Sequence, residues 1–496
     1  MLTRAKALPG RFLHGGAAGD AGSVGGRRIA SNVALQLLAQ VITMAFSVVT
    51  VSLTARTLAR DGFGVWSASS SYTALFGVLT DLGLTIVALQ RMASEPEREG
   101  EWLGALVAAR TGLSLLAAAI CAASVPLFLS NPHHTHAVVL ILTFTIPSAG
   151  AGALMSVFQA RLRGGLALAL TVLQSALWLT AVILLARAHA SVVAFAVAYA
   201  VLIATMALIQ VRVTARYAHI AWRAGLSLVR PLLRVAIPLG VASVMIRVYY
   251  QIDSVLLLQI AGAGEAGIYG AAYGFLGPLT FLPGAILSSF FPVLSAVYER
   301  DPERARRLVQ ICADAMAVIS LPILAGTIAL SGPIVELLFG AAFQRSAGVL
   351  PILMLAFVSI CFGTLAGFLA PLLNRQWRLA LYSSIGAVAN VALNLVLIPP
   401  YGARGSAWAT VATEVLTMVL MLGTSLRALR LRLLPWRTLR TVALAAAMTG
   451  VMILLRPLGL VPAGTLGVLF YVAGLFVARV VDRDELRAIR AQPLDR

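Results

Sequence analysis

Long apolar stretches and short polar gaps alternate along the chain after its first 30 residues. There are fourteen such stretches, and most contain the 20 or so residues that a helix needs to cross a bilayer. The pattern therefore predicts an all-α polytopic membrane protein with about 14 transmembrane helices. We expect these helices at residues 31–55, 64–91, 103–128, 137–159, 165–187, 190–211, 235–261, 266–295, 307–330, 347–373, 378–399, 403–426, 437–456 and 460–480.

Positive charge is sorted between the two alternating sets of gaps. Of the 38 Lys and Arg residues, 30 lie on the side of the N-terminal segment and only six lie in the opposite gaps. Because Lys and Arg stay on the cytoplasmic side during insertion, both termini are predicted to be cytoplasmic. The net charge of +19 is then a topology signal, and nucleic acid is not an expected partner because no soluble face gathers the basic residues. Lys6 is the only lysine beside 37 arginines, which suggests a GC-rich genome and a bacterial inner membrane.

The composition excludes a large soluble domain. Hydrophobic residues make up 60% of the chain and charged residues 11%, against roughly 45–50% and about 25% in soluble domains. The longest internal gap, 212–234, has room for an interfacial helix only. Cys121, Cys312 and Cys361 lie in apolar stretches and no spacing resembles a metal or disulfide site, so neither a metal nor a cofactor is expected.

An internal repeat appears at an offset of 203 residues. Residues 59–68 align with residues 262–271, and each copy is a tight turn followed by Gly, an aromatic and a small residue at the start of a helix. An offset of six helices keeps the orientation, so we expect two parallel lobes with a substrate site between them. The predicted division is a cytoplasmic basic tail (1–30), a first lobe (31–211), a cytoplasmic linker (212–234), a second lobe (235–426), two further helices (427–481) and a cytoplasmic tail (482–496).

Six ionisable residues lie inside apolar stretches, where charge is costly and commonly functional. Arg247 is thirteen residues past Arg234, or about 20 Å in at 1.5 Å per residue. The other deep residues are Asp81, Asp253 and Glu414, and the two shallower ones are Arg110 and Asp314. The alternative interpretation is that these residues form structural ion pairs or extend to the interface.

Polar residues also follow single faces of three predicted helices. In the first helix Gln36 and Gln40 belong to a stripe of amides and hydroxyls that begins at Asn32 and continues at spacings of three or four, which is one helical face. Such a face either lines a hydrated cavity or bonds to neighbouring helices, and the large amides favour the cavity. In the seventh helix Arg247, Tyr250 and Gln251 share a face, and in the eleventh Asn390 and Asn394 do so. The first and seventh helices occupy matching positions in the two lobes, as a central cavity requires.

Several motifs occur in an order that resembles a known family. They are the segment 55–91 with Asp81-Leu82-Gly83-Leu84, the pair Ile252-Asp253, the segment 266–273, and the segment 390–399 followed by Tyr401-Gly402-Ala403. Across roughly residues 30–425 the chain resembles bacterial polysaccharide flippases. These belong to the multidrug/oligosaccharidyl-lipid/polysaccharide exporter superfamily.

The resemblance implies two six-helix lobes around a cavity that opens alternately to each membrane face. It implies a lipid-linked oligosaccharide substrate, whose pyrophosphate is bound by cationic residues, for O-antigen, capsule or exopolysaccharide biosynthesis. Arg247 is the expected central cation, because a guanidinium pairs well with phosphate oxygens. The further expected contacts to pyrophosphate or sugar are Arg110, Gln36, Gln40, Tyr250, Gln251, Asn390 and Asn394. The first helix departs from some relatives in lacking an arginine at cavity depth.

Coupling to an ion gradient needs a carboxylate that can gain and lose charge. Asp81 is our first candidate, followed by Glu414 and then Asp253. The expected partners are the lipid-linked substrate, membrane lipid, and a polymerase and chain-length regulator of the same pathway.

Other function classes fit less well. An ion-coupled small-molecule or drug antiporter of the same superfamily stays open because of the three carboxylates. A membrane glycosyltransferase, polymerase or ligase usually needs a large outer loop with catalytic residues, and every outer gap here is short. Hydrolysis of ATP by this chain is excluded because a phosphate-binding loop needs a lysine, and Lys6 lies in the tail. We therefore expect no enzymatic activity and no catalytic residues.

Overall fold

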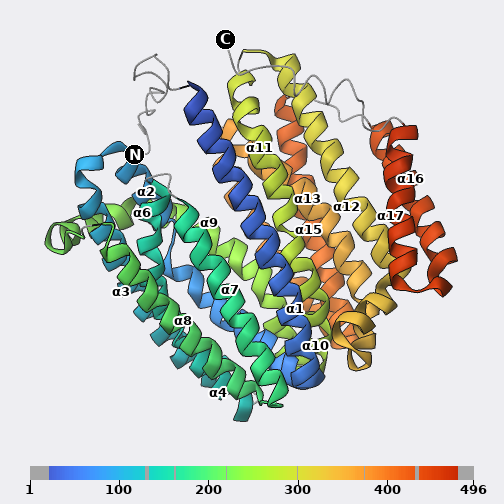
Figure 1. Ribbon diagram of the computed structural model, residues 1–496, viewed down its shortest axis with the longest axis horizontal. Coiled ribbons are helices and arrows are strands. Elements are labelled where there is room, and N and C mark those ends of the chain that lie inside the picture. The colour runs from blue at the N-terminus through green and yellow to red at the C-terminus, as the bar shows by residue number, and fades with distance from the viewer. Residues whose placement is uncertain are drawn as a thin grey trace.

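The computed structural model describes residues 22–128, 133–160, 164–218, 220–298, 300–373, 375–429 and 435–478. Within these ranges every regular element is a helix, which confirms the predicted all-α fold (Figure 1). Thirteen segments of the described chain are long and apolar enough to cross a membrane. The first of them, Leu38–Ser94, contains two crossings because the chain leaves helical geometry at Ala59 (φ 55°, ψ −175°), so about fourteen helices cross, as predicted.

The helices are numbered in chain order, with η for 3₁₀ turns. The first half of the chain contains α1 (Gly22–Gly77), η1 (Val78–Thr80), α2 (Leu84–Ser94), η2 (Pro96–Arg98), α3 (Glu99–Phe128), α4 (His133–Thr143), η3 (Ile146–Ser148), α5 (Ala149–Gly152), η4 (Ala153–Met155), α6 (Ser156–Ala160), α7 (Gly164–Arg187) and α8 (Val192–Ala215). The second half contains α9 (Trp222–Ala261), α10 (Ala263–Leu279), α11 (Phe281–Val297), α12 (Pro302–Phe339), η5 (Ala341–Gly348), α13 (Leu350–Leu372), α14 (Gln376–Tyr401), α15 (Ala403–Leu429), α16 (Pro435–Leu455), η6 (Arg456–Leu458) and α17 (Leu460–Val477).

The second predicted helix is broken near its middle. Leu82 and Gly83 both have left-handed backbone conformations, with φ of 43° and 79°, and they separate η1 from α2. Hydrophobic periodicity does not reveal such a break, because the apolar side chains continue across it. Broken backbone is tolerated at membrane depth only where protein or water satisfies its polar groups. Here Gly240 of α9 packs directly on Leu82, so protein covers the break.

Helix α9 is much longer than the predicted seventh helix. It begins at Trp222, so most of the segment predicted as a linker is helical. Gly225 near its start lies against the backbone of Gly104 and Ala105 in α3, where an added Cβ would be within 2.8 Å of backbone atoms. The first part of α9 therefore packs in the first lobe, and its last part packs against α14.

The first crossing, which is the part of α1 before Ala59, packs in the opposite sense: it belongs to the first half of the sequence but lies against the second lobe. Its Val51 packs against Gly274 of α10. Arg56 donates from Nε to the Leu338 carbonyl at 2.9 Å, at the C-terminal end of α12, where a cation is favourable. In Figure 1 this part of α1 (dark blue) lies beside α10 of the second half. The lobes in space thus differ from the sequence halves at the first and seventh helices.

The last two helices form an attachment at one edge of the molecule, beside α12 (Figure 1). An apolar cluster that includes Ala329, Met448 and Tyr471 joins them to α12. Arg437 of α16 also pairs with Asp314 of α12 at 3.2 Å. Both groups are largely buried, so removing either one would leave a costly unpaired charge.

The two copies of the repeat touch each other at backbone distance. A Cβ added to Gly64 would overlap the carbonyl oxygen of Ala263, and one added to Gly267 would overlap the carbonyl oxygen of Arg60. Only glycine permits this approach, as in other close helix contacts within membranes. The contact joins the two lobes at the membrane end where α1 bends and α9 gives way to α10.

We predict that Gly64→Ala lowers the melting temperature of the detergent-solubilised protein. The overlap with the Ala263 carbonyl outweighs the helix propensity gained, because overpacking typically costs about 1–3 kcal/mol and the Gly to Ala propensity gain is about 1 kcal/mol. Gly363→Ala is the matched control, since a Cβ there meets nothing within 4 Å and only the propensity gain remains. Equal responses of the two variants would contradict the close contact.

Candidate functional site

The polar stripe of the first helix faces the protein interior. Apolar side chains on the opposite side of this helix are exposed, as a lipid-facing surface would be: Leu38, Val41 and Val49. Along the stripe itself exposure falls steadily, because Gln36 is exposed, Gln40 is partly exposed, and Thr50 and Thr54 are buried. The stripe therefore lines accessible space near Gln36 and is sealed towards the contact between the repeats.

Arg247 is an exposed cation on α9 that has no ion pair or hydrogen bond with any described residue. It lies fifteen residues before the turn at Gly262, or about 22 Å along the helix. The repeat offset of 203 pairs it with Met44, so it lies at the depth of the stripe. An unpaired guanidinium at this depth is available to an anionic ligand.

Tyr250 and Gln251 follow Arg247 on α9 and are partly buried. The Tyr250 carbonyl accepts a hydrogen bond from the Tyr273 hydroxyl of α10 at 3.3 Å. The Tyr250 and Tyr249 rings lie 4.9 Å apart. Tyr250 thus stands between the exposed Arg247 and the buried interior of the second lobe.

Asp81 and Arg110, predicted for different roles, are brought together at the break between η1 and α2. The Asp81 carboxylate accepts from the Thr85 backbone N–H at 3.2 Å, which caps the first turn of α2. Arg110 Nη1 lies 3.7 Å from the same carboxylate oxygen and donates to the Thr85 hydroxyl at 3.2 Å. The Arg110 side chain is mostly buried, and this group closes the break in the second crossing.

Asp253 is the centre of a buried polar cluster in the second lobe. Its Oδ1 accepts from Asn394 Nδ2 at 2.8 Å, and its Oδ2 accepts from the hydroxyls of Tyr269 at 2.7 Å and Thr410 at 2.8 Å. Asn394 Oδ1 in turn accepts from the Ser406 hydroxyl at 2.8 Å. Four helices (α9, α10, α14 and α15) therefore meet at one carboxylate.

Asn390 and Asn394 belong to this cluster and are completely buried. Asn394 Nδ2 also donates to the Asn390 carbonyl at 2.9 Å, while Asn390 Nδ2 has no hydrogen-bond partner among the described residues. We predicted both as substrate contacts, and in this conformation they are buried beside the ion-coupling candidate Asp253. Their shared face turns inward into the second lobe.

Glu414 faces the same region from α15. A space of about 10 Å³, enough for about one water-sized centre, is enclosed by Leu276, Ile360 and a ring of polar residues. The polar residues in its wall are Tyr249, Tyr250, Asp253, Tyr273, Thr410 and Glu414. Glu414 Oε1 and the Tyr249 hydroxyl are buried atoms without a hydrogen-bond partner in the described chain. Two carboxylates and several neutral oxygens around one small space suit a proton or a small hard cation.

Sequence reasoning did not identify Tyr269, Ser406 and Thr410 as members of this cluster. A signal was present, since Ser406, Thr410 and Glu414 follow each other at spacings of four on one face of α15. Tyr269 is the aromatic residue of the second repeat copy. Among the described residues, no group of three or more His, Cys, Asp or Glu residues has the arrangement of a metal site.

Comparison with known proteins identifies the family. Residues 29–297, more than half of the chain, match the profile of the family described as "Polysaccharide biosynthesis protein". A relative described as "Probable flippase AglR" from Haloferax volcanii is 27% identical over 175 residues. That alignment covers 35% of this chain and 37% of the relative, so it spans little more than a third of the relative's length.

Solved structures show the same fold over most of the chain. The lipid II flippase MurJ in an inward closed conformation superposes with a TM-score of 0.72 at 14% identity, covering 91% of this chain and 99% of that one. An inward-facing multidrug resistance MATE family transporter of the MOP superfamily superposes with a TM-score of 0.61 at 15% identity, covering 79% and 94%. At these identities the likeness concerns the fold alone. It confirms the predicted fold of about fourteen membrane-crossing helices.

We predict that Asp81 and Arg110 are energetically coupled. Asp81→Asn leaves the mostly buried Arg110 guanidinium without its carboxylate, so it should lower the melting temperature more than Arg110→Met does, since the Asp81 side chain is the more exposed of the two. The double variant should be more stable than the sum of the single effects implies, by roughly 0.5–3 kcal/mol as for contacting residues. Chemical unfolding of all four proteins in detergent measures this difference, and additive effects would contradict the pair.

Proposed function

Because the chain belongs to the polysaccharide biosynthesis protein family, we propose that it translocates polyprenyl-pyrophosphate-linked oligosaccharide repeat units across the bacterial inner membrane. The product would supply O-antigen, capsule or exopolysaccharide biosynthesis. The partners in this proposal are the lipid-linked substrate, membrane lipid, and a polymerase and chain-length regulator of the same pathway. Both termini lie in the cytoplasm, as the arginine distribution indicates.

The observation that carries the proposal is the unpaired, exposed Arg247 at the level of an inward-facing polar stripe. A permanently charged guanidinium in a membrane is costly unless a partner arrives, and a pyrophosphate is a suitable partner. Gln36 and Gln40 lie on the accessible part of the stripe, where their amides reach sugar hydroxyls. Tyr250 and Gln251 stand on the same α9 face as Arg247.

Alternating access follows from the way the lobes touch. The contact at Gly64 and Gly267 closes one end of the space between the lobes, while the stripe becomes accessible towards the other end. By the charge distribution the accessible end is cytoplasmic, so this is the loading conformation. Translocation requires the glycine contact to part and the cytoplasmic ends of the lobes to approach.

Ion coupling in this proposal resides in the pair Asp253 and Glu414. Both carboxylates border one enclosed space, and Asp253 is held by three other helices. Entry of a proton or small cation would neutralise charge there and change how these helices pack around α9. Asp81 has a different environment, since Arg110 already compensates its charge.

A second candidate function is an ion-coupled small-molecule antiporter. The buried carboxylates and the fold shared with multidrug transporters support it. A deletion strain separates the two functions. Loss of surface polymer with accumulation of complete, cytoplasm-facing lipid-linked oligosaccharides supports the flippase, whereas normal polymer with altered drug susceptibility supports the antiporter. Leaflet exposure is measured with a periplasmic sugar-modifying probe.

We predict that Arg247→Ala abolishes polysaccharide export, whereas Arg247→Lys retains part of it. Lysine keeps the charge but loses the planar pair of donors that binds two phosphate oxygens together. Arg187→Ala is the matched control, because Arg187 is an exposed arginine at the end of α7 and should be dispensable. Surface polymer is quantified at equal membrane expression. Normal export by Arg247→Ala would remove Arg247 from substrate binding.

We predict that Asp253→Asn transports without dependence on an ion gradient, whereas Asp81→Asn keeps this dependence. The first change removes the charge from the buried cluster, and the second alters a carboxylate that Arg110 already neutralises. Transport of the lipid-linked substrate in proteoliposomes is measured with imposed proton and sodium gradients. The reverse result would return the coupling role to Asp81.

A further inference from the structure

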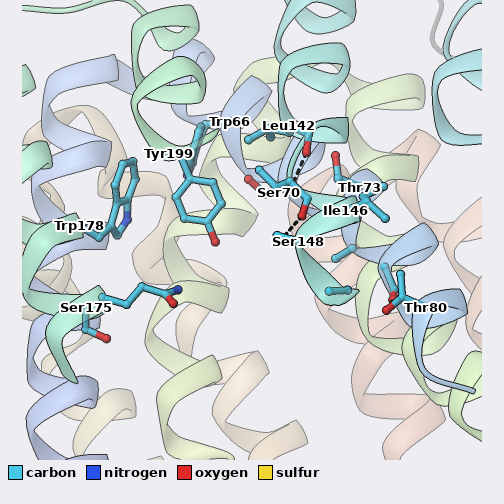
Figure 2. A pocket seen from close by; sticks show the side chains of 15 residues that line it. Trp66, Ser70, Thr73, Thr80, Leu142, Ile146, Ser148, Ser175, Trp178 and Tyr199 are labelled. Carbon is cyan, nitrogen blue, oxygen red and sulfur yellow. Dashed lines mark hydrogen bonds between the residues drawn. The ribbon is translucent and has the colours of Figure 1, made fainter. Parts of the chain in front are cut away.

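A cavity of about 480 Å³ lies inside the first lobe, and neither Arg247 nor Asp253 is among the residues that line it. The second crossing (Trp66 to Thr80), α4 with the turn that follows it, α7 and α8 form its walls. Figure 2 shows Trp178 and Ser175 on one side and Ile146, Ser148 and Thr80 on the other, with the Tyr199 hydroxyl directed into the space between. Its volume is in the range of small-molecule sites.

Hydroxyl groups supply hydrogen-bond acceptors to this cavity. The Thr73, Thr80 and Thr145 hydroxyls donate to carbonyls of their own helices at 2.6–2.9 Å, and Ser175 does the same at 3.0 Å. With their protons engaged, the oxygen lone pairs remain available to a ligand. None of the lining residues is charged.

Four polar groups supply unused donors. The indole N–H groups of Trp66 and Trp178, the Tyr199 hydroxyl and the Gln174 amide make no hydrogen bond with any described residue. These four groups lack a partner but are not fully buried, so they border accessible space. Buried Trp and Tyr usually find partners for these groups, and in this cavity only a ligand or water provides them.

Aromatic rings form one wall. Trp66 and Trp178 are nearly parallel, with centroids 5.9 Å apart and planes 23° apart. Tyr199 meets both edge-on, at 6.0 Å from Trp66 and 4.9 Å from Trp178. A rigid aromatic wall opposite a row of hydroxyls offers an apolar surface and hydrogen bonds to the same ligand.

We propose that this cavity binds an uncharged sugar ring of the transported oligosaccharide. A sugar ring has apolar C–H faces that stack on indole, and hydroxyls that both donate and accept hydrogen bonds. The inference rests on the proposed function, because it names a subsite for the glycan part of that substrate. The pyrophosphate stays with Arg247, and the glycan reaches into the first lobe.

Other ligand classes fit the lining poorly. A phosphate needs cationic donors, and a cationic drug needs a carboxylate, but all lining residues are neutral. An acyl chain would bury the free indole, amide and phenol donors without partners, at about 1–3 kcal/mol each. A neutral polyhydroxylated ring satisfies both the donors and the acceptors.

The cavity also extends along the second crossing. Trp66 and Thr80 are fourteen residues apart on the second crossing, which is about 21 Å at 1.5 Å per residue if the helix were regular throughout. One end lies beside the contact between the repeats, and the other lies at the break after Asp81. A sugar ring in this cavity therefore lies between the break and the contact between the repeats.

The test compares two probes on the full-length protein in nanodiscs. One probe is polyprenyl-pyrophosphate oligosaccharide extracted from the deletion strain, and the other is polyprenyl pyrophosphate without sugar. We expect the wild type to bind the glycosylated probe more tightly. Gln174→Leu and Trp178→Leu should each weaken that probe about tenfold, which corresponds to 1.4 kcal/mol, and leave the sugar-free probe unchanged.

Controls separate this inference from the proposed function. Trp408→Leu, at a half-exposed tryptophan of α15 outside the cavity, should bind both probes as the wild type does. Arg247→Ala should weaken both probes. If the wild type binds neither probe, the proposed function fails. If the wild type prefers the glycosylated probe and the cavity variants keep that preference, or if the wild type shows no preference at all, the sugar subsite is wrong while the flippase proposal stands.

Discussion

The two repeats meet through backbone atoms at Gly64 and Gly267, and the rest of the architecture is arranged around this contact. With no side chain between them, the second crossing and α10 approach closely and seal one end of the space between the lobes. The first crossing and α9 each end at the turn that precedes this contact. The sealed end therefore sets where both helices stop. The polar stripe and Arg247 consequently reach the same depth from opposite lobes. A transporter needs one such contact that is tight yet small enough to part.

The first crossing packs in the second lobe, and the first part of α9 packs in the first lobe. These two helices therefore bring together regions that are far apart in the sequence. Gly240 of α9 packs on Leu82, next to the break that Asp81 and Arg110 close. Thirteen residues later, on the same uninterrupted helix, Asp253 anchors the polar cluster of the second lobe. A change in charge at Asp253 thus acts on a helix whose other half belongs to the first lobe. This is a physical route for coupling that involves one rigid element with two environments.

Charge is distributed among compartments with different chemistry. The exposed cation lies on α9, the buried carboxylates lie within the second lobe, and the cavity of the first lobe is lined by neutral groups. In a medium of low dielectric constant, opposite charges placed together would pair and lose their availability, as Asp81 and Arg110 have done. Separation keeps Arg247 available for an anion and the carboxylates available for a cation.

The sequence by itself determined the membrane class, the number of crossings, the repeat and the position of each ionisable residue along its apolar stretch. These properties depend on hydropathy, charge and spacing along one dimension, and insertion into a bilayer acts on the same variables. Arg247 could be singled out because an arginine thirteen residues inside an apolar stretch is costly wherever the helix packs.

Only the tertiary structure decided which groups meet. The break at Leu82 and Gly83, the pairing of Asp81 with Arg110, and the union of Asn394, Tyr269 and Thr410 on Asp253 depend on contacts between helices far apart in the chain. The same holds for the aromatic wall of the first lobe, whose rings come from three helices and carry no shared pattern in the sequence. Periodicity tells which face of a helix is polar, but the partner of that face is chosen by packing in three dimensions.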